Sequence, residues 1–64
     1  MSRLRLLQDC STAERDWMSE VAVVFGDREA GMARFDGRGM GEAGSRLRDL
    51  YGAYVKAREA YEAN

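Results

Sequence analysis

Two stretches of the sequence repeat apolar residues at the spacing of an α-helix, and a glycine-rich segment separates them. In the first stretch, Trp17, Val21 and Val24 recur at steps of four and three residues. Ala13, Met18 and Phe25 lie near the same side of a 3.6-residue period. Such a one-sided pattern is typical of an amphipathic helix that buries a single face.

Signals for the two ends of this helix flank the pattern. Ser11-Thr12-Ala13-Glu14 has the form of a capping box, in which Ser11 accepts from the backbone of Glu14 and Glu14 reaches back. Gly26 suits the position after a helix end. We therefore predict a helix over residues 12–25. The segment before it, with Leu4, Leu6, Leu7 and Cys10, is short enough to be either a short helix or an extended arm.

A second amphipathic helix is predicted from near Ser45 to residue 62. Apolar residues recur there at steps of three and four: Leu47, Leu50, Tyr51, Tyr54, Val55, Ala57 and Tyr61. We expect the two helices to pack through a core made of Trp17, Val21, Val24, Leu47, Leu50 and Tyr54.

The segment between the helices, residues 27–44, contains five glycines that interrupt long regular elements. Asp36-Gly37 is a turn signal within it. We expect this segment to be mostly irregular, with a short helix near residues 28–35 as the alternative.

These elements predict an all-α fold: a small helical hairpin with a glycine-rich central segment and a short N-terminal helix or arm, in one domain spanning residues 1–64. A chain of 64 residues has a thin core, and such cores usually need a disulfide, a metal or association with another chain. Cys10 is the single cysteine and histidine is absent. We therefore expect association with a partner to stabilise the thin core.

The bulk charge points to no particular partner, because the net charge is −1 and the pI about 5.3. The beginning of the sequence lacks the apolar run of a signal peptide, so we expect a cytoplasmic protein that does not enter membranes. The abundance of Arg, Ala and Gly suggests a bacterial or phage source. In size and order of elements the chain resembles small phage-encoded proteins, such as head-to-tail joining proteins and inhibitors of host enzymes.

No catalytic, cofactor or metal site is predicted. Gly39-Met40-Gly41-Glu42-Ala43-Gly44 matches the GxGxxG pattern, but a nucleotide fold also needs a strand before the glycines and a βαβ unit after them. We expect these glycines to allow backbone conformations that other residues disfavour, and to bind no nucleotide.

Cys10 has no histidine to act as its base, and we expect it to be a small buried residue. The acidic pairs Asp27/Glu29 and Asp16/Glu20 lack the apolar surroundings that raise a carboxyl pKa, and Asp36 with Glu42 matches no calcium-loop spacing.

A nucleic-acid interface is the alternative function. It would use arginines of the central segment and the second helix, with Phe35 and Tyr51 as stacking groups. The arginines are Arg28, Arg34, Arg38, Arg46 and Arg48. They are interleaved with acidic residues, so we do not expect nucleic-acid binding.

The second helix provides the preferred interface. Tyr51, Tyr54 and Tyr61 share a face with Arg58, and Tyr and Arg are enriched in interface hot spots. The alternative is that the tyrosines belong to the core. From this face we expect a non-enzymatic protein-interaction module: an adaptor, an assembly component or an inhibitor.

The charges at the ends of this helix suggest self-association. Arg46 and Arg48 lie in its first turn and Glu59 and Glu62 in its last, opposite to what the helix dipole favours. An antiparallel second copy would bring the basic start against the acidic end, which predicts a homodimer.

Overall fold

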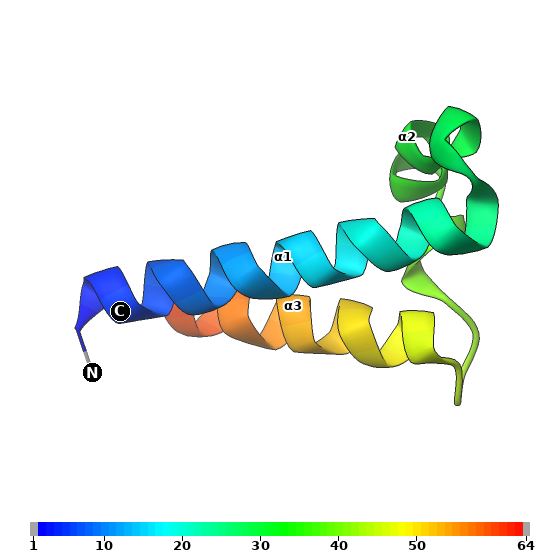
Figure 1. Cartoon of the computed structure of the whole chain (residues 1–64). Coiled ribbons are helices and arrows are strands. Elements are labelled where there is room, and N and C mark those ends of the chain that lie inside the picture. The colour runs from blue at the N-terminus through cyan, green and yellow to red at the C-terminus, as the bar shows by residue number, and fades with distance from the viewer. Residues whose placement is uncertain (1, 64) are drawn as a thin grey trace.

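The computed structural model describes residues 2–63, which contain helices and no strand. The elements are α1 (Arg3–Phe25), α2 (Asp27–Phe35), a 3-10 turn η1 (Arg38–Met40) and α3 (Arg46–Ala63). Figure 1 shows α1 and α3 side by side and antiparallel, with α2 beside the end of α1 that leads into it. The predicted all-α class is confirmed.

Helix α1 begins nine residues earlier than the predicted helix. Its N-cap is Ser2, whose Oγ accepts from the backbone N–H of Arg5 at 3.1 Å. Ser11 and Glu14 lie inside the helix and are exposed, so the predicted capping box was wrong. Residues 3–10, for which a short helix or an extended arm was expected, are helical and form the first turns of α1. Leu6 and Cys10 are half-buried and continue the face of the buried Trp17 toward the N-terminus. Packing of this face against α3 outweighs the local signal for a helix start at Ser11.

The core is small. Among the described residues, the buried apolar side chains are Trp17, Val21, Ala33 and Leu47. Leu50 and Tyr54 pack against them with partial exposure, as predicted for this pair of helices. Val24 was wrongly assigned to the core, since 52% of it is exposed. Val24 lines an open groove together with loop residues such as Gly41 and Glu42, which leaves its side chain only partly covered.

The central segment forms a short helix, the alternative considered for it. Gly26, with φ +85°, follows the last residue of α1 and precedes the first residue of α2. Irregular chain is confined to residues 36–37 and 41–45. Helix α2 contacts the rest of the molecule through small side chains, with Ala33 buried and Ala30 half-buried.

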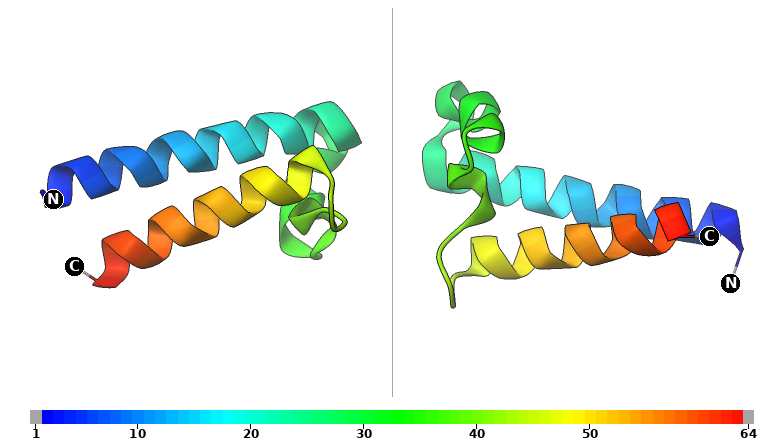
Figure 2. Two further views of the ribbon diagram at one scale, coloured as in Figure 1. Left: turned by 90° about the horizontal axis from the view of Figure 1, so that it is seen from below. Right: turned by 180° about the vertical axis from the view of Figure 1, so that it is seen from behind.

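The loop after α2 is fixed to α1 through Trp17. The indole Nε1–H donates to the backbone carbonyl of Gly39 at 2.7 Å, and this hydrogen bond is buried. Figure 2 shows the loop then crossing to the start of α3. There the Oγ of Ser45 accepts from the N–H of Arg48 at 3.0 Å and caps the helix.

No helix within residues 2–63 is long and apolar enough to cross a bilayer.

Candidate functional interface at the α2 end

The outer face of α2 exposes two large apolar side chains. Phe35 is 88% exposed and Met32 is 64% exposed. They lie on the same face as Arg28, because residues 28, 32 and 35 are spaced by four and three positions in a helix. The inward positions of α2 hold only alanines, so burial within the chain does not account for a helix that carries Phe and Met.

An open groove lies at the same end of the molecule. Its volume is about 560 Å³, within the range of ligand pockets. Its apolar wall consists of Val24 and Phe25 from α1 and Leu47 from α3. Its other lining residues come from the loop, the start of α3 and one turn of α1: Gly37, Arg38, Gly41, Glu42, Ser45, Arg46 and Glu20.

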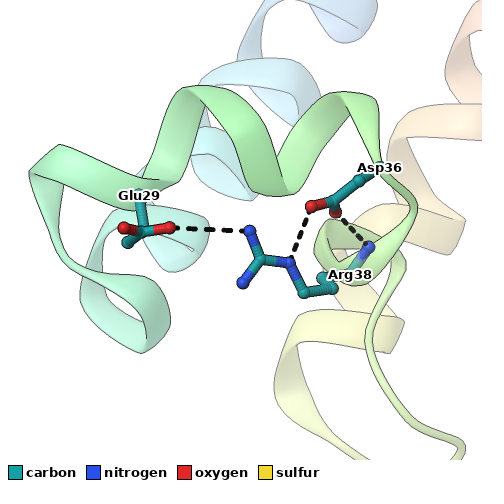
Figure 3. Close-up of polar contacts among 3 residues, drawn as sticks. All are labelled: Glu29, Asp36 and Arg38. Atoms are coloured by element: carbon teal, nitrogen blue, oxygen red, sulfur yellow. Dashed lines mark hydrogen bonds and ion pairs between the residues drawn. The ribbon is translucent and has the colours of Figure 1, made fainter.

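Arg38 holds the loop against both α2 and α1. Figure 3 shows its guanidinium between two carboxylates of the α2 segment, at 2.8 Å from Asp36 and 3.6 Å from Glu29. The backbone N–H of Arg38 also donates to Asp36 at 3.1 Å. The same guanidinium lies 5.4 Å from the centre of the Phe25 ring, within cation–π range.

The contacts with Arg38 lower the pKa of the Asp36 carboxyl below its ordinary value of 3.8. The largest cause is the hydrogen bond from the Arg38 backbone, followed among the lowering effects by the bond from its side chain. Asp36 therefore stays ionised through the neutral and mildly acidic range and keeps the clamp between α2 and the loop.

No protein-family model, curated protein or solved structure matches this chain.

The predicted tyrosine face lies largely in the seam between α1 and α3. The ring centres of Tyr51 and Tyr54 are each 5.3 Å from that of Trp17, and Tyr54 is stacked on it with 7° between the planes. Tyr61 lies under the guanidinium of Arg3 at 4.8 Å. These rings serve intramolecular packing, and the docking role proposed for them stays a prediction.

The predicted charged residues of α3 divide between paired and exposed positions. Arg58 pairs with Glu62 within α3 at 2.8 Å, and hydrogen bonds to Glu62 and Tyr54 raise the pKa of Arg58. Arg46 reaches across to Glu20 of α1 at 3.5 Å. Arg48 and Glu59 are exposed. The charges that an antiparallel second copy was expected to use are thus partly engaged within one chain.

The first two glycines of the GxGxxG segment lie where a side chain would collide with neighbouring backbone. A Cβ on Gly39 would lie 3.1 Å from the carbonyl oxygen of Ala33. A Cβ on Gly41 would lie 2.6 Å from the backbone nitrogen of Arg48, and Gly41 has φ +80° and ψ 161°. The loop can approach α2 and the start of α3 this closely only without side chains, which fits the expected role of these glycines in backbone conformation.

The remaining reactive groups are dispersed. Cys10 is half-buried rather than fully buried as expected, and its thiol is free. Within residues 2–63 no three His, Cys, Asp or Glu side chains gather into a potential metal site. Glu29 and Glu20 of the two acidic pairs each have an arginine partner, Arg38 and Arg46.

Met32 and the role of Phe35 in an apolar face were not predicted from the sequence. Phe35 was considered only as a stacking group for nucleic acid. The signal that identifies the face is the spacing of residues 28, 32 and 35, which has meaning only once residues 27–35 are assigned to a helix.

Proposed function

We propose that this chain is a non-enzymatic protein-binding module whose contact surface lies at the α2 end. The main support for this proposal is that Phe35 and Met32 are exposed on a helix whose inward positions are alanines. Aromatic residues and Met are enriched in protein interfaces, and a contiguous exposed apolar surface marks binding sites in soluble proteins.

The overall dimensions support association with a partner. The accessible surface is 4698 Å², whereas a compact monomer of 7.2 kDa exposes about 4,100 Å². The radius of gyration is 12.2 Å, compared with about 11 Å for a compact domain of this length. Within residues 2–63 only four apolar side chains are buried, so burial of the α2 face by another protein would add to a thin core.

The tyrosine face of α3 is a weaker candidate for the contact surface, because Tyr51 and Tyr54 already pack on Trp17. On the α2 face, by contrast, Phe35 is 88% exposed and Met32 is 64% exposed. An adaptor, an assembly component or an inhibitor would each use such a surface.

Affinity capture from the native host with matched variants tests this function. Phe35→Ser removes the aromatic side chain, and Val23→Ser is the control because Val23 is 77% exposed on α1, outside the groove lining. We expect a protein that is retained by the unmodified chain and by Val23→Ser but lost with Phe35→Ser. Equal retention by all three chains would show that the α2 face is not the contact surface.

A further inference from the structure

Residues 27–40, which comprise α2 and η1, are held together by contacts within the segment. Arg38 of η1 pairs with Asp36 at 2.8 Å and with Glu29 at 3.6 Å. Gly39 packs so closely on α2 that a Cβ there would lie 3.1 Å from a carbonyl oxygen of that helix. These contacts do not involve α1 or α3, so the segment can keep its shape if it moves relative to them.

The ties between this segment and the rest of the chain are weaker. Within the part of the chain that the structure describes, no ion pair joins residues 27–40 to α1 or α3. One side-chain hydrogen bond does so, from the Nε1–H of Trp17 to the carbonyl of Gly39. The apolar contacts of the segment with the buried cluster come from alanines, whose side chains bury little area. A segment with few buried apolar contacts opens at a lower free-energy cost than the whole fold.

Glycines lie at both junctions of the segment. Gly26, between α1 and α2, has φ +85° and ψ 156°, a conformation that residues with a Cβ rarely adopt. After η1, residues 41–45 form no helix and include Gly44, which also has φ +85°. Figure 2 shows both junctions at one end of the α1–α3 pair. Rotation at these two places moves the segment and leaves α1 and α3 as they are.

The seam between α1 and α3 does not depend on the segment for its main contacts. In the buried cluster, Trp17 and Val21 belong to α1 and Leu47 belongs to α3. Tyr54 of α3 stacks on Trp17 with 5.3 Å between the ring centres. The two long helices can therefore stay paired while α2 moves.

We propose that residues 27–40 form a lid over one end of the α1–α3 seam, which pivots at Gly26 and at residues 41–45. In the open position the hydrogen bond between Trp17 and Gly39 is broken, and this end of the seam is uncovered. Hinged closure of this kind needs only a few residues that absorb the change in φ and ψ. The exposed face of α2 moves with the lid, so a partner that contacts both this face and α1 would hold the lid in one position. The lid itself is inferred from its attachment and does not depend on that partner.

Hydrogen exchange of the Trp17 indole Nε1–H, followed by nuclear magnetic resonance on the full-length chain, reports lid opening. Trp17 is the single tryptophan, so its indole signal is unambiguous. The proton is buried and bonded to Gly39 in the closed position. We expect its protection against exchange to be at least about tenfold lower than that of the Leu50 and Tyr54 amides in α3. Its exchange should also depend little on low concentrations of urea, because lid opening exposes less surface than unfolding.

Two variants separate lid opening from unfolding of the whole chain. Leu6→Ala removes a half-buried side chain from the part of α1 far from the lid. It should accelerate exchange of the Leu50 and Tyr54 amides and leave the indole rate unchanged. Gly26→Ala strains the closed junction and should accelerate indole exchange roughly tenfold. If circular dichroism shows that this variant loses helix, Gly26→Asn replaces it, because Asn tolerates positive φ better.

Three results would overturn the lid. The first is an indole proton that is as protected as the α3 amides and has the same dependence on urea. The second is equal acceleration of the indole and the α3 amides in Leu6→Ala, and the third is an indole rate that the Gly26 substitution leaves unchanged. None of them bears on the α2 face as a contact surface, which affinity capture tests separately.

Discussion

At the scale of single residues, Trp17 connects α1 to both α3 and the loop. It lies on α1, contacts Tyr51 and Tyr54 of α3, and donates to the Gly39 carbonyl in the loop. The apolar period of the sequence predicted that Trp17 is buried. The hydrogen bond could not be predicted, because nothing local in the sequence indicates that residue 39 lies beside residue 17.

Trp17→Phe should separate the hydrogen bond from the burial of the ring. The substitution keeps an aromatic side chain but leaves the buried Gly39 carbonyl without its donor, which costs about 1–3 kcal/mol of unfolding free energy. Trp17→Ala should cost about 3–5 kcal/mol because it also leaves a cavity. Urea unfolding followed by circular dichroism gives both values. A Trp17→Phe chain as stable as the unmodified one would show that the hydrogen bond contributes nothing.

At the scale of elements, the helix periods were predictable and the start of α1 was not. The Ser11–Glu14 pattern is a sound local cap signal, yet both residues lie within a helix of 23 residues. A local signal has no information about Tyr61, whose ring lies beside Arg3 and gives the first turn of α1 a tertiary contact. The sequence did not decide whether residues 27–35 form a helix, for a similar reason. The inward side chains of α2 are alanines and its large apolar side chains are exposed, so the usual apolar period is weak.

Two serine substitutions test where α1 begins. Ser2→Ala removes the observed N-cap and should cost about 1 kcal/mol. Ser11→Ala replaces an exposed position inside the helix by the best helix former and should stabilise by a few tenths of a kcal/mol. Thermal unfolding of both variants measures the difference. The reverse order of stabilities would return the helix start to residue 12.

The attachment of α2 should depend on pH through Asp36. Its pKa is lower in the folded chain than the ordinary 3.8, so its stabilising contribution is complete above that value and is lost as the pH falls through the folded-state pKa. Asp36→Asn should therefore lose less stability than the unmodified chain on acidification below pH 5. Asp9→Asn, which removes the same charge from α1, is the control. Identical acid profiles for Asp36→Asn and the unmodified chain would contradict the role of the Arg38 clamp.

At the scale of the whole molecule, the chain is elongated, with extents of 35 × 22 × 17 Å and a core that occupies a small part of that length. The thin core was predictable from the chain length, and the structure has it. Association with a partner was inferred from the lack of a disulfide or zinc site and stays a prediction. The location of the contact surface did not follow. The tyrosines drew attention to α3, and only the packing of α1 against α3 shows that two of them are engaged internally.

The most direct measurement of the central claim is site-specific photo-cross-linking in the native host. A benzophenone side chain replaces Phe35 in one chain and Val23 in a control chain, both at strongly exposed positions. If the α2 face is the binding surface, irradiation should yield a discrete adduct of the chain with another protein molecule at position 35 and none at position 23. Adducts of equal yield at both positions, or none at position 35, would contradict the account.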